Sequence, residues 1–559
     1  MSGYRLKDGG VWTDRGREIR FRVDGRVAAG FYGDTLASAL LASGVLRLGR
    51  SSRYCRPRGV FGADDDPAGL RVARAGRPAR ALDRAAREVD LEADLEVRRP
   101  ARGWLSLPFA LIGGEALRGP RRISCPGEGD GVADTTDTGN TGTLEAACDV
   151  LVVGAGPAGL MATKVAAAAG LRVLLVDENR QAGGRLVETS GRLDGAATHD
   201  WALATARALG ALPNVTMLPR TRVCSAGEGC VLRAVEQGVS GRRDWRIAAR
   251  HVVWAAGARE RSLIFAGNDL PGVMLASAGL ACARRHGVAV GHKVIVFANN
   301  DGGARTALAL HDAGVGVKAV VDMRSRPDPA LVTALAVRGI RLEAGAVVAA
   351  ARGRRAIKGV DIRGFDPRSG QLGPNVMHPS CDALLVSGGW IPRLPAGTTA
   401  AFDARLNAFV PSETARDWTI CGAAAGLLAL NDDLDSGRAA GAAAVRACGG
   451  DLGEVPACPR VEAGEPADLP LGVVEVPAQG RAKRFLDLRH DVTVEDLERA
   501  ERAGFAGRGG DRLAAVLGLA TSRAGLANPD ALAVLARLRG CSVPELVGSS
   551  PVVAPRGGP

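Results

Sequence analysis

The apolar and polar positions change their spacing along the chain, and these changes predict where strands and helices lie. Residues 148–153 (CDVLVV) and 171–176 (LRVLLV) are continuous apolar runs, typical of parallel strands that are buried on both faces. A Gly-rich turn and an Ala-rich helical segment at 159–170 separate them, so the pattern predicts a βαβ unit. The segment at 252–258 (VVWAAGA) is expected to add a further strand to this unit.

A second βαβ unit is predicted by a strand at 293–298 (KVIVFA), a helical segment, and a strand at 317–321 (VKAVV). Strand-like residues at 381–389 and 419–426 then return to the pattern of the first unit. The fold class predicted is α/β, with two dinucleotide-binding (FAD/NAD(P)-binding), Rossmann-like domains, the second inserted into the first.

The residues before these units predict a small separate module. Residues 19–29 alternate around an Asp24–Gly25 turn, which indicates a β-hairpin, and residues 34–46 have helical spacing with Asp34 or Thr35 as the cap. A hairpin followed by a helix and a loop is typical of a β-grasp-like module. We therefore expect such a module at 1–100, a linker at 101–147, the first Rossmann-like domain at 148–290 and 376–450, the inserted second domain at 291–375, a linker at 451–480, and a small helical module with a tail at 481–559.

The composition narrows the class of protein. Of 559 residues, 46% are hydrophobic and 24% are charged, as in a soluble folded protein. No stretch reaches the length of an apolar membrane span and the N-terminus lacks the apolar core of a secretory signal, so we expect a cytoplasmic protein. The net charge is +12, but the basic residues are scattered and aromatic residues make up only 4%, which argues against a nucleic-acid partner.

The eleven cysteines include no C-x-x-C or C-x-C pair, so neither a structural zinc ion nor a cysteine-ligated cluster is expected. The C-x4-C pair of disulfide reductases is absent from the sequence as well. The seven histidines form no H-x-x-E or H-x-H motif. We therefore predict no metal site.

The strongest chemical signal is the motif Gly154-Ala155-Gly156-Pro157-Ala158-Gly159 between the first predicted strand and helix. In such a motif the first glycine allows a tight turn, the second lets the backbone approach a pyrophosphate, and the third lets helix and strand pack closely. The helix N-terminus then offers N–H groups and a partial positive charge to the phosphates. The predicted cofactor-binding residues are Gly154, Gly156, Pro157, Ala158 and Gly159.

Two acidic residues follow at the end of the second predicted strand. Asp177 and Glu178 come 23 and 24 residues after Gly154. A carboxylate at this position hydrogen-bonds a ribose 2′-OH and repels a 2′-phosphate, which favours NAD or FAD over NADP. The run Gln181-Ala182-Gly183-Gly184-Arg185 extends the fingerprint of flavoproteins with two dinucleotide domains.

Two further motifs bear on which cofactor is bound. FAD enzymes of this fold commonly have Gly-Asp where this chain has Gly422-Ala423, and that aspartate holds the ribityl hydroxyls of the flavin. Ala423 cannot accept these hydrogen bonds, which favours NAD in this domain and leaves FAD as the alternative. In the second unit Asn299-Asn300-Asp301 stands in place of the glycine motif, where side chains would crowd a pyrophosphate, so we interpret that unit as structural.

These motifs together resemble the α subunits of heterotetrameric sarcosine oxidases. The resemblance rests on residues 24–60, on ERSLIFAGNDLPGVMLASA (260–278) followed by GHKVIVFANNDGGARTAL (291–308), and on 485–505 and 517–546. It implies a ferredoxin-like first module, NAD bound in this chain, FAD on a β subunit, FMN at the interface between them, and small γ and δ subunits. The implied reaction is the oxidative demethylation of a secondary amine, sarcosine, with release of H2O2.

The resemblance also implies additional NAD contacts and assigns no catalytic residue to this chain. These contacts are expected at Ala158, Asp177, Glu178, Asn179, Arg185, Val223, Ala425, Leu430 and Asp432.

The sequence departs from the family in several places. It ends where the family's folate-binding, aminomethyltransferase-like domain would begin, so we expect that domain to be absent. The family's His-Arg-Pro-Arg-Gly run reads Cys55-Arg56-Pro57-Arg58-Gly59 here, and its Lys-Arg-Tyr-Thr run is replaced near 508–516. Relatives among the opine and amino-acid dehydrogenase A subunits bind iron–sulfur clusters in their first and last modules. Because the clustered cysteines are missing here, we expect no cluster.

Two alternatives to a sarcosine oxidase-like subunit stay open at this point. One is an FAD-containing A subunit of an opine, proline or amino-acid dehydrogenase. The other is a non-catalytic scaffold that only organises partner subunits.

Overall fold

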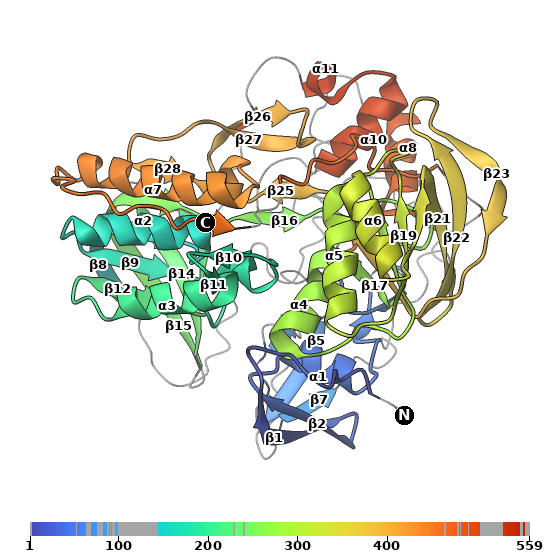
Figure 1. Cartoon of the computed structure of the whole chain (residues 1–559), viewed down its shortest axis with the longest axis horizontal. Coiled ribbons are helices and arrows are strands. Elements are labelled where there is room, and N and C mark those ends of the chain that lie inside the picture. The colour runs from blue at the N-terminus through green and yellow to red at the C-terminus, as the bar shows by residue number, and fades with distance from the viewer. Residues whose placement is uncertain are drawn as a thin grey trace, which may run out of the picture.

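A computed structural model describes residues 3–51, 53–62, 69–74, 82–85, 89, 91, 95–98, 143–226, 230–238, 241–462, 466–477, 480, 482–489, 491–502, 529–547 and 552–553. Two α/β units lie side by side, with the N-terminal strands below the second unit and the C-terminal helices above it (Figure 1).

The first α/β unit is built on a seven-stranded sheet. Its path is β12-β9-β8-β15-β14-β13, and β28 pairs with β15. The strands are β8 (Leu144–Val153), β9 (Val173–Val176), β12 (Val215–Leu218), β13 (Thr221–Ala226), β14 (Val231–Gly238), β15 (Gly241–Trp254) and β28 (Trp418–Ile420). Val150 and Val152 of β8 face the helices, whereas Leu151 and Val153 face the opposite layer. The continuous apolar run arises because both faces of β8 are covered.

The helices of this unit are α2 (Pro157–Ala168), α3 (Thr198–Gly210) and α7 (Leu430–Ala447). Glycines on α7 allow its close approach to α2, because a Cβ on Gly437 or Gly441 would overlap backbone atoms of Ala158 or Ala162. The helix predicted at 159–170 begins two residues earlier in the structure and ends at Ala168.

The second unit has a five-stranded parallel sheet in the order β17-β24-β18-β19-β20. Its strands are β17 (Val273–Leu275), β18 (Val294–Ala298), β19 (Val317–Asp322), β20 (Arg341–Ala344) and β24 (Ala383–Ser387). One face packs against α4 (Ala276–His286), α5 (Asp301–Asp312) and α6 (Pro329–Val337), and the other against the antiparallel strands β21 (Ala346–Gly353), β22 (Ile357–Asp366) and β23 (Gln371–Met377) (Figure 1).

Two short antiparallel strands connect the units, namely β16 (Ala258–Glu260) and β25 (Trp390–Pro392). The predicted strand at 252–258 is thus divided, since β15 ends at Trp254 and β16 begins at Ala258. Next to the first unit lie β10 (Arg192–Leu193), β11 (Ala196–Ala197) and β29 (Val461–Glu462) in one small sheet, and β26 (Thr399–Asp403), β27 (Ala408–Glu413) and β32 (Val552–Val553) in another.

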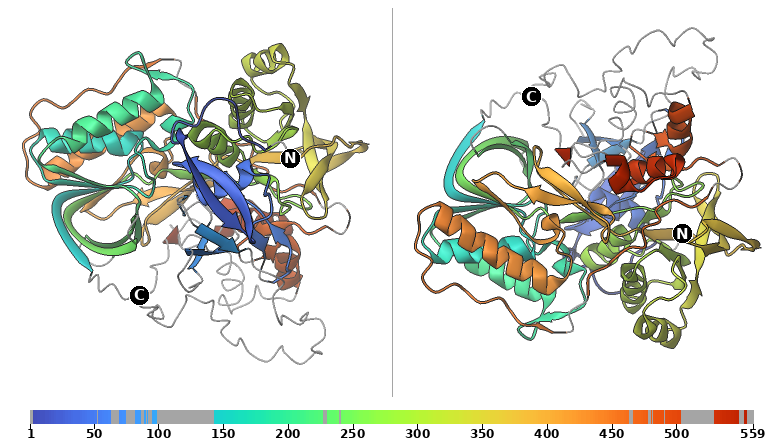
Figure 2. Two further views of the ribbon diagram at one scale, coloured as in Figure 1. Left: turned by 90° about the horizontal axis from the view of Figure 1, so that it is seen from below. Right: turned by 90° about the horizontal axis from the view of Figure 1, so that it is seen from above.

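The N-terminal module contains the sheet β2-β1-β7-β5-β6, helix α1 and the hairpin β3–β4. Its elements are β1 (Asp14–Val23), β2 (Arg26–Tyr32), α1 (Leu36–Ala42), β3 (Gly49–Arg50), β4 (Pro57–Arg58), β5 (Gly69–Arg74), β6 (Leu82–Ala85) and β7 (Leu95–Arg98). The predicted hairpin turns at Asp24 and Gly25, both with positive φ, and Thr35 caps α1. Seen from below, this sheet lies across the junction of the two α/β units (Figure 2).

Two segments expected to be linkers belong in part to the folded structure. Residues 144–147 are the start of β8, while 101–142 lie outside the described residues. In the second segment, Val474 and Val476 are buried, and Ile264 exchanges backbone hydrogen bonds with both. Apolar Val and Leu residues between the prolines explain why this segment packs onto the second unit.

The C-terminal module contains β30 (Phe485–Asp487), β31 (Val492–Thr493), α8 (Val494–Arg502), α10 (Pro529–Arg539) and α11 (Val543–Val547). Residues 503–528, which include the replaced run at 508–516, lie outside the described residues. No helix among the described segments is long and apolar enough to cross a membrane. The ten cysteines in the described part of the chain are free thiols.

Candidate functional site

The glycine motif forms the turn between β8 and α2, and each glycine meets a different steric need. Gly154 has a φ of +105°, and a Cβ there would overlap the Ala255 carbonyl oxygen. A Cβ on Gly159 would overlap the Gly154 carbonyl oxygen, so a larger residue would force α2 away from β8. A Cβ on Gly156 would have no atom within 4 Å, which means that this glycine borders open space.

This open space lies at the N-terminus of α2, where no side chain caps the helix. Pro157 stands in the first turn, where its missing N–H costs no hydrogen bond. Uncapped N–H groups, the positive end of the helix dipole and a backbone without a side chain are what a pyrophosphate requires. The residues of this turn therefore fit the diphosphate of a dinucleotide.

Asp177 follows β9 and is held beside the glycine turn by backbone groups. Its Oδ2 accepts the Ala155 N–H at 2.6 Å and its Oδ1 accepts the Asn179 N–H at 2.6 Å. Burial raises the pKa of Asp177, and the two N–H donors oppose that rise. Because a carboxylate has roughly four acceptor positions, each oxygen retains capacity for a ribose hydroxyl.

Glu178 has different partners from its neighbour. It forms ion pairs with Arg222 of β13 at 3.0 Å and with Arg393, which follows β25, at 2.9 Å. Asn179 turns the chain, since its carbonyl oxygen accepts the Arg220 N–H at 2.9 Å. Of the two predicted carboxylates, Asp177 is the one fixed at the glycine turn.

The other predicted contacts lie on neighbouring elements. Val223 is on β13, whose first residue, Thr221, donates its N–H to the Asp177 carbonyl oxygen at 2.7 Å. Ala425 ends the 3-10 helix η4 (Gly422–Ala425) and Leu430 begins α7. Asp432 is exposed in the first turn of α7.

Arg185 lies near one buried and two partly buried acidic residues that no sequence motif indicated. It belongs to the 3-10 helix η3 (Gly184–Val187), and its guanidinium carbon lies 3.6 Å from the centroid of the Trp390 ring. Burial raises the pKa of Glu260 and of Asp433 to about 7, and raises the pKa of Asp468, while the positive charge of Arg185 opposes each rise. The pKa values of Glu260 and Asp433, two carboxyl groups near Arg185, thus lie near neutral pH.

Glu260 and Asp433 each lie at a helix start. The Glu260 Oε2 accepts the Ser277 N–H of α4 at 2.7 Å. The Asp433 carboxylate lies in the first turns of α7 and bonds the backbone of Ala423. A Cβ on Gly422 would overlap the Asp433 Oδ1, so this carboxylate lies directly over the glycine.

The position of Asp433 bears on the choice between NAD and FAD, for which the sequence offered only Ala423. The sequence favoured NAD because the Ala423 side chain cannot accept hydrogen bonds from the ribityl hydroxyls of a flavin. The structure places the Asp433 carboxylate of α7 over Gly422, so an acidic side chain lies next to this position although residue 423 is alanine. No sequence motif marks Asp433, because its position over Gly422 depends on how α7 packs against the rest of the unit.

In the second unit an acidic side chain from another segment lies at the start of α5. The Asp468 carboxylate lies beside Gly302 at the start of α5 and forms an ion pair with Arg305. Asn299, which is fully buried, donates from Nδ2 to the carbonyl oxygens of Leu471 and Val473. A carboxylate at this helix start would repel a phosphate, which supports the interpretation of this unit as structural.

Two family models match the chain. Residues 148–394 match the pyridine nucleotide-disulphide oxidoreductase family, and residues 16–93 match the 2Fe-2S iron-sulfur cluster binding domain family. The second match covers a segment with one cysteine, Cys55, whereas a [2Fe–2S] cluster needs four thiolates. The match therefore supports the predicted ferredoxin-like fold of the first module.

The whole chain also has relatives and a similar solved structure. It is 34% identical to the sarcosine oxidase α subunit of Rhizobium meliloti, over 98% of this chain and 57% of that protein, and 32% identical to that of Corynebacterium sp. (strain P-1), over 97% and 55%. The crystal structure of L-proline dehydrogenase from P. horikoshii matches 100% of this chain and 99% of that one, with a TM-score of 0.67 and 17% identity. This structure confirms the predicted fold class. Over nearly its whole length the chain is a relative of sarcosine oxidase α subunits, and it spans little more than half the length of those it matches.

Proposed function

We propose that this chain is the dinucleotide-binding, α-type subunit of a sarcosine oxidase-like complex that oxidises a secondary amine and releases H2O2. In this proposal NAD is held at the glycine turn, FAD is on a β-type partner, FMN lies at the interface between the two, and small γ- and δ-type subunits complete the assembly. The observation that carries it is the open, uncapped α2 N-terminus at Gly156 beside Asp177, in a chain related to these subunits throughout.

The residues of this chain would bind and orient the dinucleotide. The α2 N-terminus would hold the diphosphate, and the Asp177 carboxylate, already fixed by two N–H donors, would accept a ribose hydroxyl. A nicotinamide dinucleotide supplies hydride transfer when bound, and the protein supplies position and electrostatics. Glu260 would hold a proton near neutral pH, because burial raises its pKa to about 7.

Gly156→Ala tests the dinucleotide site without changing the packing of the protein. An alanine Cβ at 156 meets no protein atom within 4 Å and Gly156 has an ordinary φ of −73°, so the variant is expected to fold as the parent does. The added methyl group lies where the pyrophosphate would approach, so bound dinucleotide is expected to fall at least tenfold. Gly364→Ala is the matched control, because it also adds a Cβ in open space.

The measurement is chromatography and mass spectrometry of the nucleotide released when each purified protein is denatured. Parent and Gly364→Ala proteins are expected to release NAD in near-equal amounts, and Gly156→Ala very little. If the parent releases none and binds none when it is supplied, the proposal fails. Co-expression with partner subunits, followed by addition of sarcosine and measurement of H2O2, tests the reaction itself.

A second candidate is an FAD-containing A subunit of an opine, proline or amino-acid dehydrogenase. Asp433 favours it, since this carboxylate lies over Gly422, next to the position where FAD enzymes of the fold carry an aspartate. Part of the chain is also 31% identical to the A subunit of opine oxidase from Agrobacterium tumefaciens, over 32% of this chain. Release of FAD from the parent and its loss in Asp433→Asn, but not in the exposed control Glu454→Gln, would favour this candidate over the first.

A further inference from the structure

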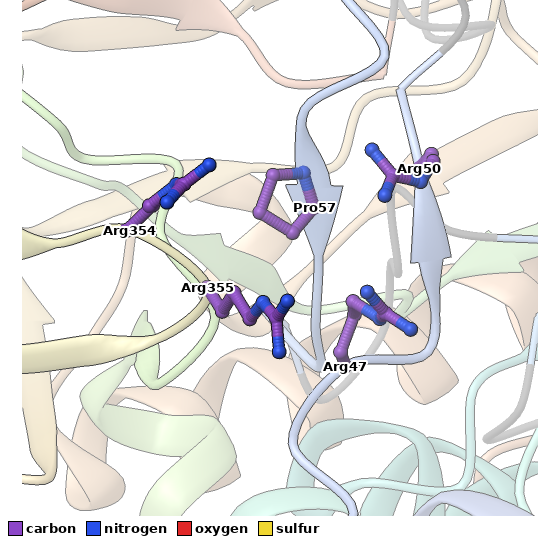
Figure 3. A pocket seen from close by; sticks show the side chains of 5 residues that line it. All are labelled: Arg47, Arg50, Pro57, Arg354 and Arg355. Carbon is purple, nitrogen blue, oxygen red and sulfur yellow. The ribbon is translucent and has the colours of Figure 1, made fainter. Parts of the chain in front are cut away.

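Two basic turns from distant parts of the chain meet around one cavity. The cavity has a volume of about 300 Å³ and is lined by Arg47, Arg50, Pro57, Arg354 and Arg355. The first three residues come from the β3–β4 hairpin and the residues just before it, and the last two from the turn between β21 and β22. Figure 3 shows the four arginine side chains arranged around Pro57.

Both turns are held in place by the backbone. In the β21–β22 turn, Gly353 has a φ of +159° and a Cβ there would overlap the Ala356 carbonyl oxygen, so the tip is tight. The N–H of Ile357, just after the tip, donates to the Pro271 carbonyl oxygen at 2.9 Å. A Cβ on Gly59, just after β4, would lie 3.2 Å from the same proline. Both turns therefore lie close to Pro271.

Three of the four arginines in the cavity have no acidic partner in the described part of the chain. No carboxylate there forms an ion pair with Arg50, Arg354 or Arg355, and Arg50 donates to the Cys55 carbonyl oxygen at 2.7 Å. A cavity of this volume is roughly 8 Å across, about the Debye length at physiological ionic strength, so the guanidinium charges are only partly screened from one another. An anion in the cavity would remove this repulsion.

We propose that this cavity binds the phosphate groups of a compact, small polyanion. Guanidinium groups present planar pairs of N–H donors that match the oxygens of a phosphate, and the charges of Arg50, Arg354 and Arg355 together suit more than one negative charge. Among the described residues that line the cavity, Pro57 alone carries no charge, so they offer no aromatic surface for a base or a flavin ring. This site lies on elements other than the glycine turn and does not depend on the proposed dinucleotide.

Inorganic pyrophosphate is the probe, and isothermal titration calorimetry at low ionic strength is the measurement. All proteins carry Gly156→Ala, so that the glycine turn does not contribute to binding. Arg354→Gln with Arg355→Gln is expected to weaken pyrophosphate binding at least tenfold, because two charge-assisted donors are removed. The matched control is Arg326→Gln with Arg416→Gln, which removes the same charge from exposed arginines elsewhere.

The outcomes separate this proposal from its rivals. The proposal is supported if the Gly156→Ala protein and the control both bind pyrophosphate more tightly than the Arg354/Arg355 double variant does. Equal affinity in all three proteins overturns it, because the binding would then follow overall charge. Binding of an oligoglutamate peptide at these arginines without binding of pyrophosphate also overturns it, and would assign the cavity to an acidic protein segment.

Discussion

Replacement of Arg58 by methionine is expected to loosen the contact between the N-terminal module and the rest of the chain. Arg58 is 1% exposed and bridges two buried carboxylates. Its Nη1 donates to Asp269 at 2.5 Å, and its Nη2 donates to Asp491. Asp269 precedes the second unit's sheet and Asp491 lies beside β31, so one guanidinium joins three parts of the chain.

The size of the stability loss depends on the hydrogen-bond donors that each carboxylate keeps after the substitution. Breaking a buried ion pair from one side costs about 3–5 kcal/mol, since the remaining charge stays buried. Asp269 keeps a hydrogen bond from Arg56 at 2.7 Å, and Asp491 keeps the N–H groups of Arg53 and Tyr54 at 2.8 and 3.3 Å. Because these partners remain, the expected loss of stability lies near the lower end of this range, at about 3 kcal/mol.

Hydrogen exchange followed by mass spectrometry measures this loss locally, which avoids the assumption of two-state unfolding in a chain with several domains. The amides of Leu48 and Ser51 donate to Arg58 and Arg56 across the β3–β4 hairpin at 2.9 and 2.8 Å. A loss of about 3 kcal/mol makes their exchange on the order of a hundred times faster. Exchange in β18 and β19 is expected to stay unchanged.

Arg58→Lys is the charge-conserving control. A single ammonium group lacks the planar fork that reaches both carboxylates, so an intermediate increase in exchange is expected. If Arg58→Met leaves the exchange of the hairpin amides within about threefold of the parent value, the bridge does not hold the module in place and the reasoning is refuted.

Three further results are expected. Burial raises the pKa of Glu260 in the folded protein to about 7, so the parent protein loses stability as pH rises from about 4.5 to 7. In thermal scans the melting temperature of Glu260→Gln should therefore rise relative to that of the parent between pH 5 and pH 8. A difference between the two melting temperatures that does not change with pH would contradict this. Gly437→Ala should lower the melting temperature and the dinucleotide content together, because its Cβ would overlap α2, whereas Gly364→Ala should change neither. Iodoacetamide at pH 7 should modify the exposed Cys55 and leave Cys148 unmodified in peptide mass spectra, because burial raises the pKa of the Cys148 thiol to about 12. Equal labelling of the two cysteines would contradict the burial of Cys148.

The sequence was sufficient for features that depend on local geometry. The glycine turn, the Asp24–Gly25 hairpin and the Thr35 cap each rest on the conformational preferences of a few consecutive residues. The strand at 148–153 was also predictable, because burial on both faces requires an unbroken apolar run. Its extension back to Leu144 was not, since residues 144–147 pair with β15 and their composition alone does not indicate a strand.

The candidate site was predictable only where its residues lie at a fixed distance along the chain from a motif. Asp177 follows a strand at a fixed distance from the glycine motif, and the structure places it at the turn. Asp433 of α7 lies over Gly422 and Asp468 lies beside Gly302 at the start of α5, and no spacing rule connects these carboxylates to Ala423 or Asn299.

The sequence by itself determined the fold class, the glycine turn and the acidic residue beside it, because backbone conformation and strand burial impose requirements on neighbouring residues. The tertiary structure decided which charged groups meet. Arg58 joins carboxylates more than two hundred and four hundred residues away, and Arg354 and Arg355 face the hairpin of the first module. Electrostatic interactions depend on distance in space, and packing of segments remote in the chain sets that distance.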